Sequence, residues 1–171
     1  MFITDKYDQR LFDIAAKKYN PFRNSSKYTE KYKFKIINKL NNKLDINNVT
    51  EDNIVEVIEL LKKENPQQGS FVHWSNLDDL STFAEEKPEV VNKLLHNILD
   101  KSNNLADSID NFRKRGKEFD SKISLGTPLF GYILSSFDKE NYLLYKDGPF
   151  KNFIKLFELN KPSSLGEKYK F

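Results

Sequence analysis

Apolar residues recur at intervals of three and four positions along most of the chain, and this spacing restricts the fold more than any other feature. Between residues 5 and 19, for example, Tyr7, Leu11, Ile14 and Ala15 repeat with the period of a helix. A half-buried strand requires apolar and polar residues to alternate. In this sequence they never alternate over more than about four positions. The sequence therefore predicts an all-α fold with little sheet.

The same periodicity predicts one compact bundle of about eight short helices, separated by segments rich in proline, glycine or polar residues. The expected ranges are 5–19, 30–44, 51–63, 76–86, 88–98, 105–115, 129–137 and 150–159. A chain of 171 residues of which 38% are hydrophobic has enough apolar material for one core. We therefore expect a single helical domain over residues 1–171.

Two features suggest a finer organisation. Pro66 and Gly69 mark the best internal boundary. The alternative to one undivided domain is therefore a division into two subdomains, residues 1–65 and residues 70–160. Pro162, Ser163 and Gly166 lie in the last eleven residues, and this composition is typical of a linker. We expect residues 161–171 to connect this domain to a missing downstream domain.

Composition excludes several classes of protein. The chain has no cysteine, which removes disulfide scaffolds, thiol nucleophiles and cysteine-bound zinc. No apolar run approaches about 18 residues, so we expect no membrane contact and a cytoplasmic location. The net charge of +3 neither requires nor excludes a nucleic-acid partner.

Catalytic motifs are largely missing. Gly126 and Gly131 have the spacing of a phosphate-binding loop, but Tyr132 and Ile133 stand where that loop needs a lysine and a hydroxyl residue. The two histidines are 23 residues apart, so we expect no metal site, no cofactor and no enzymatic activity.

One basic cluster precedes a glycine turn and an apolar helix. Amide groups at the start of that helix, near Gly126 and Thr127, together with the basic side chains would bind phosphate. The alternative is that Gly126 is only a turn and that the cations complement the end of their own helix. The basic side chains are those of Arg113, Lys114, Arg115 and Lys117.

Trp74 is the only tryptophan. Leu77 and Leu80 follow it at helical spacing, which favours burial in the core. The alternative is that its ring stacks on an extruded or single-stranded base. Basic and aromatic residues also alternate over 27–35, and a solvated face is the favoured interpretation there.

The order of four segments in the second half resembles a known family. These are Val72-His73-Trp74-Ser75-Asn76-Leu77 and the ranges 107–112, 126–134 and 137–145. They resemble the helical region ahead of the AAA+ GTPase module in McrB-type restriction and phage-defence proteins. The resemblance implies a non-catalytic domain that recognises DNA, with modified DNA as one option. GTP hydrolysis would belong to the AAA+ module of the same full-length protein, and cleavage to a McrC-type nuclease.

A second similarity lies within the same region. The glycine turn, the apolar helix and residues 142–147 look like a helix-hairpin-helix DNA glycosylase, and the resemblance implies that Asp147 is the catalytic carboxylate. The second glycine and the nucleophilic lysine of those enzymes are missing, so only a monofunctional glycosylase is compatible. Asp147 as a helix cap is the favoured interpretation. A protein–protein adaptor is the third alternative.

Overall fold

The computed structural model describes residues 9–25, 29–67, 70–156 and 160–170, and in these ranges all the regular structure is helical. The all-α prediction is therefore confirmed. Besides a 3₁₀ turn at Ile46–Asn48, the described residues form the helices α1 (Gln9–Asn24), α2 (Lys31–Asn41), α3 (Ile54–Glu64), α4 (Trp74–Glu86), α5 (Pro88–Leu99), α6 (Leu105–Phe119), α7 (Thr127–Phe137), α8 (Asp147–Leu156) and α9 (Leu165–Lys170).

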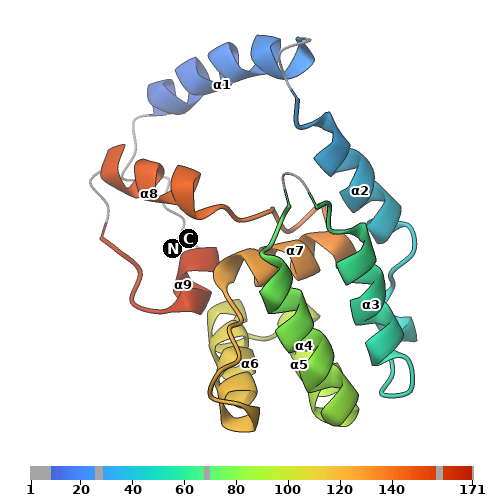
Figure 1. Cartoon of the computed structure of the whole chain (residues 1–171). Coiled ribbons are helices and arrows are strands. Elements are labelled where there is room, and N and C mark those ends of the chain that lie inside the picture. The colour runs from blue at the N-terminus through green and yellow to red at the C-terminus, as the bar shows by residue number, and fades with distance from the viewer. Residues whose placement is uncertain (1–8, 26–28, 68–69, 157–159, 171) are drawn as a thin grey trace.

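Helix α7 is the centre of the molecule. It contains no charged residue, and nine of its eleven residues are buried, because a helix that is apolar on all sides must be covered on all sides. It packs against α2, α5 and α9, and α3 to α6 extend from one side of it (Figure 1). The buried hydroxyl of Tyr132 donates a hydrogen bond of 2.9 Å to the carbonyl of Leu61, which fixes α7 to the end of α3. This burial raises the pKa of Tyr132.

One contiguous core joins both halves of the chain. Leu40 and Leu61 lie in the same buried cluster as Leu77, Ile109 and Leu134. Helices α3 and α4, which flank the expected boundary at 66–69, also pack along each other. The described residues on either side of that boundary therefore share one core.

Helices α1 and α2 have ends that differ from expectation. Helix α1 continues to Asn24 and contains Pro21 close to its end, where a proline removes one intrahelical hydrogen bond. Helix α2 begins after Glu30, without a side-chain cap from Thr29. Residues 5–8 and 157–159, which we expect to be helical, lie outside the described residues.

The expected linker is part of the fold. Helix α9 packs against α6, and the amide of Gly166 donates a hydrogen bond of 2.9 Å to Oδ1 of Asp110. A β-carbon on Gly166 would lie 2.0 Å from the carbonyl oxygen of Ala106, so only glycine permits this approach. The Tyr169 hydroxyl also donates to the carbonyl of Leu143 at 2.8 Å. The prediction of a linker is therefore wrong for residues 165–170, which form α9 and pack against α6.

None of the helices in the described ranges is both long enough and apolar enough to span a membrane.

Candidate nucleic-acid interface

The predicted basic cluster lies on the last two turns of α6, with all four side chains exposed. Arg115 forms an ion pair of 2.8 Å with Glu118, and Lys114 lies 3.8 Å from the same carboxylate. Lys117 donates a hydrogen bond of 2.7 Å to the carbonyl of Ser121. Such exposed pairs are weak, so a ligand could displace them, but Glu118 offsets part of the positive charge.

Two amide groups of the glycine turn before α7 donate to side chains of α4. Ser124 donates its amide to the carboxylate of Asp79 at 2.8 Å, and Gly126 donates its amide to Oδ1 of Asn76 at 3.4 Å. Thr127 is only 4% exposed. Asn76 and Asp79 lie three residues apart on α4, beside the glycine turn. Their side-chain oxygens accept the hydrogen bonds that we expected a bound phosphate to accept. The DNA contact predicted at Gly126 and Thr127 therefore gains no support from these contacts and stays a prediction.

Trp74 is 67% exposed, so the favoured expectation of a core tryptophan is wrong. It is the first residue of α4, and its ring lies against that of His73 with centroids 5.5 Å apart. Trp74 and Leu77 line a hollow of about 350 Å³ beside the end of α3. The position at the start of the helix explains the exposure, because the core-facing stripe of α4 begins at Leu77.

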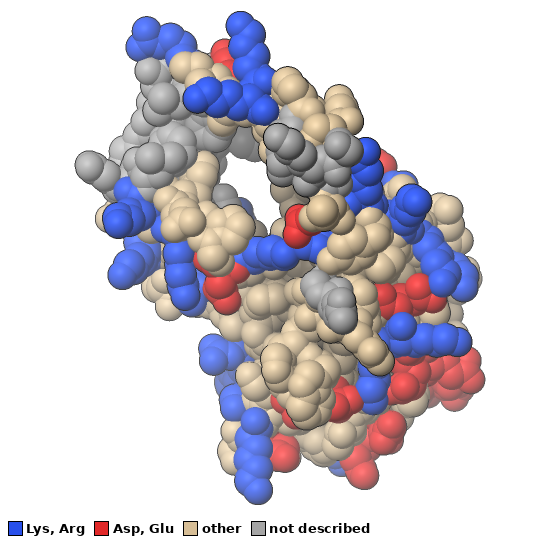
Figure 2. Space-filling model, turned by 45° about the horizontal axis from the view of Figure 1, so that its top comes forward, with Lys and Arg blue, Asp and Glu red and all other residues tan. Residues whose placement is uncertain are grey.

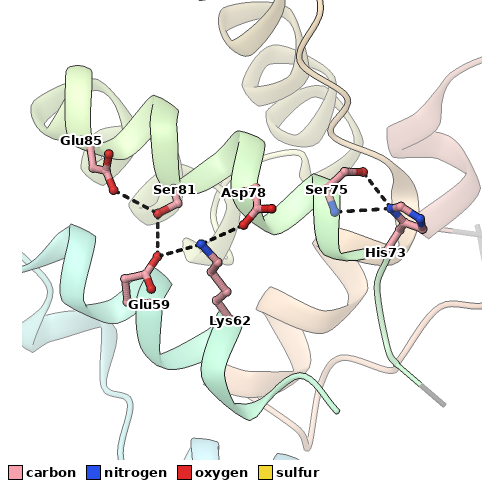
Figure 3. Close-up of polar contacts among 7 residues, drawn as sticks. All are labelled: Glu59, Lys62, His73, Ser75, Asp78, Ser81 and Glu85. Carbon is pink, nitrogen blue, oxygen red and sulfur yellow. Dashed lines mark hydrogen bonds and ion pairs between the residues drawn. The ribbon is translucent and has the colours of Figure 1, made fainter. Parts of the chain in front are cut away.

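Next to Trp74, a row of polar contacts joins α3 to α4 (Figure 3). Lys62 forms an ion pair of 2.7 Å with Asp78 and one of 3.5 Å with Glu59, and the hydrogen bond to Asp78 raises its pKa. Ser81 donates a hydrogen bond of 2.7 Å to Glu59. The groups drawn in the figure pair with one another, as expected of contacts that hold two helices together.

His73 also has a structural role. Its Nδ1 atom accepts a hydrogen bond of 3.3 Å from the amide of Ser75, and it thereby caps α4. The Nε2 atom of His96 lies 3.0 Å from the carbonyl of Val49, between α5 and the turn before α3. Within the described part of the chain, no three His, Asp or Glu side chains gather in a way that would hold a metal ion.

Asp147 lies in the first turn of α8, where the helix dipole stabilises a negative charge. Its carboxylate accepts a hydrogen bond of 3.2 Å from the hydroxyl of Tyr145. Burial, and then the negative charge of Asp147, raise the pKa of Tyr145. These contacts fit a role at the start of a helix.

Sequence reasoning missed the strong segregation of charge along the chain. Residues 51–100 contain eleven acidic and four basic residues, a net charge of −7, while residues 1–50 carry +6 and residues 101–171 carry +4. Helix α4 has four acidic and no basic residues, and α2 has four lysines and no acidic residue. In Figure 2 many acidic side chains gather at the lower right and several basic ones follow the upper edge. Counting charge by segment would have revealed this.

Three of the four lysines of α2 form an exposed row. Lys31, Lys35 and Lys39 follow each other at intervals of four residues and are all exposed, and we call them the lysine stripe. Lys33 is instead buried and pairs with Glu30. One lysine of the stripe has an ion pair in the described structure, because Lys39 lies 2.6 Å from Glu64.

Other basic groups border the stripe. The guanidinium of Arg23 lies 5.1 Å from the centre of the Phe34 ring, which joins the end of α1 to α2. Lys139, which follows α7, donates a hydrogen bond of 2.9 Å to Asn38. Basic side chains therefore border α2 both at the end of α1 and just after α7.

Comparison with known proteins gives no significant match to a family model, to a curated protein or to a solved structure.

Proposed function

We propose that this chain is a non-catalytic DNA-recognition domain whose lysine stripe contacts the phosphate backbone. The observation that carries the proposal is the segregation of charge. Lysines are the only charged residues of α2, and acidic residues are the only charged residues of α4. Electrostatic contact with phosphates supplies most of the affinity of a DNA-binding surface, and clustering matters more than net charge.

The spacing of the stripe suits a polyanion. Residues four positions apart on a helix are separated by about 6 Å along its axis, so the stripe extends over about 12 Å. Three cations over that length would neutralise up to three phosphates, which predicts a slope of about −2.7 in a plot of log affinity against log salt for duplex DNA.

The resemblance to McrB-type proteins supplies the biological setting of the proposal. In that setting, the domain selects DNA for a restriction or phage-defence system, and an AAA+ GTPase module and a McrC-type nuclease act on the selected DNA. The corresponding test compares unmodified, cytosine-modified and adenine-modified duplexes. A preference of tenfold or more for one of them, a usual range for a specific contact, would support this setting.

The central experiment measures fluorescence anisotropy of labelled duplex DNA at several salt concentrations. The triple variant Lys31→Gln, Lys35→Gln and Lys39→Gln should weaken binding and make the salt slope shallower by about 2.7. The matched control Arg113→Gln, Lys114→Gln and Arg115→Gln removes the same charge from α6. We expect a smaller effect, because Glu118 already offsets part of that cluster.

Two outcomes contradict the proposal. If the α6 variant abolishes binding and the α2 variant does not, the phosphate contact lies on α6. If the parent protein binds no DNA even at low salt, the domain belongs to another class, and the protein–protein adaptor becomes the leading alternative.

A further inference from the structure

A groove of about 580 Å³ lies between residues 141–146, α8 and α9. Five of its thirteen lining residues are aromatic, three are lysines, and no carboxylate is among them. This composition differs from that of the hollow beside Trp74, which includes Asp78. The groove therefore offers ring faces and positive charge together.

The aromatic rings of the groove are partly accessible and held in place. Tyr142, Phe153 and Tyr169 are each half-buried, and the neighbouring Leu143 is 79% exposed. The hydroxyl of Tyr169 donates to the carbonyl of Leu143 at 2.8 Å, which fixes the ring on the groove wall. Rings fixed in this way lose little entropy when a flat ligand stacks on them.

The positive charges lie on two sides of the groove. Lys146 lies at the end of the segment that precedes α8, and Lys168 and Lys170 belong to α9. All three side chains are exposed. A flat ligand that carries phosphates on its edges fits this arrangement better than a neutral apolar ligand does.

The groove lies beside the start of the lysine stripe. Lys146 lies 3.4 Å from the carboxylate of Glu30, and Glu30 is the residue that immediately precedes α2. Lys31, the first residue of the stripe, follows it directly. A polyanion that lies along α2 therefore meets Lys146 at the end of the stripe and then the aromatic rings.

We infer that this groove binds the unstacked bases of single-stranded DNA, whose backbone lies along the lysine stripe. This inference rests on the proposed function and names its substrate class. Aromatic rings bind bases of any sequence because each base has a flat face, and interleaved lysines follow the backbone. An acidic amphipathic peptide would also bind the apolar and positive groups of the groove. It would not account for the position of the groove beside the start of the lysine stripe.

The experiment compares three labelled ligands at the same salt concentration: a short single strand, the duplex of the same sequence, and a single strand without bases. The last ligand keeps the phosphates and removes the stacking. We expect the natural single strand to bind at least tenfold more tightly than the strand without bases, because each stacked base contributes about 5- to 150-fold. The double variant Tyr142→Leu and Phe153→Leu should abolish this difference and leave the weaker electrostatic binding.

Tyr19→Leu is the matched control, because it removes an exposed aromatic ring of α1 that does not line the groove. Photocrosslinking of a halogenated-uracil strand to the parent protein provides a second measurement that does not depend on the folding of a variant. We expect the crosslinks to fall in residues 141–153 and in α9.

The outcomes separate the inference from the proposed function. If strands with and without bases bind equally, and the α2 variant loses both, the phosphate contact stands and the base groove is refuted. If no DNA binds, both proposals fail together. If DNA avoids the groove and a designed acidic amphipathic peptide loses affinity in the double variant, the groove is a protein-docking site and the inference is overturned.

Discussion

The carboxylate of Asp79 lies 2.8 Å from the backbone amide of Ser124, 45 residues further along the chain. This contact closes the turn before α7 with a side chain of the protein itself. The same turn is where sequence reasoning places a bound phosphate. The contact therefore favours a structural role for this turn over phosphate binding, and a substitution of Asp79 tests that role.

Asp79→Ala should lower the free energy of unfolding by about 1–2 kcal/mol, because the Ser124 amide loses its acceptor. Glu86→Ala is the control, since it removes the same charge from the exposed end of α4. Urea unfolding measures both. If the turn binds phosphate, Asp79→Ala should increase DNA affinity more than Glu86→Ala does, and we expect equal effects.

Gly166→Ala should be strongly destabilising, by about 3 kcal/mol or more, because the new methyl group would overlap the carbonyl of Ala106 on α6. Gly148→Ala in α8 is the matched control. A β-carbon there meets nothing within 4 Å, and alanine in place of glycine in a helix is favourable by about 0.5–1 kcal/mol. Thermal unfolding should therefore shift in opposite directions for the two variants. A tolerated Gly166→Ala would mean that α9 does not pack as closely as described.

Trp74→Ala should change the free energy of unfolding by less than about 0.5 kcal/mol, as is usual for exposed positions. Phe83→Ala, in the core of the same helix, should cost about 3–5 kcal/mol. The fluorescence of Trp74 should resemble that of indole in water and be quenched by iodide. A blue-shifted emission that iodide does not quench would contradict the exposed position.

Glu30 should make stability depend on pH in the acid range. A hydrogen bond from Lys33 holds the pKa of Glu30 below its usual value. The folded state therefore binds this proton less readily than the unfolded state does. The resulting stabilisation is complete above the ordinary glutamate pKa of about 4.3, and it disappears as the pH falls through the lowered value.

Glu30→Gln should therefore lose less stability between pH 6 and about pH 3 than the parent protein does, as measured by urea midpoints at each pH. Glu51→Gln, in the exposed turn before α3, is the control. An unchanged acid dependence in Glu30→Gln would show that the ion pair with Lys33 does not contribute.

Much of the helical fold follows from periodicity, and the deviations come from tertiary contacts. The apolar helix expected at 129–137 is observed as α7, only two residues longer at its start. Helix α9 was missed because Gly166 reads locally as a helix breaker, whereas here it permits contact with Ala106. No local pattern indicates such a contact between distant segments.

The candidate site was less predictable than the fold. The basic side chains on α6 are exposed as expected. A sequence cannot show, however, that Asn76 of α4 accepts a hydrogen bond from the amide of Gly126. Similarly, the helical spacing of Trp74 and Leu77 is compatible with burial of both residues, although only Leu77 belongs to the core. The exposed row of lysines on α2 follows from the same periodicity, once charge is counted by segment.

The separation of positive α2 from negative α4 has a consequence for the approach to a partner. A molecule charged in this way has an electric dipole moment, so the field of a polyanion rotates it before any contact forms. Acidic residues of α4 that touch no ligand would then influence how often a collision is productive. Neutralising Glu86 should accordingly alter the salt dependence of the association rate more than it alters the lifetime of the complex.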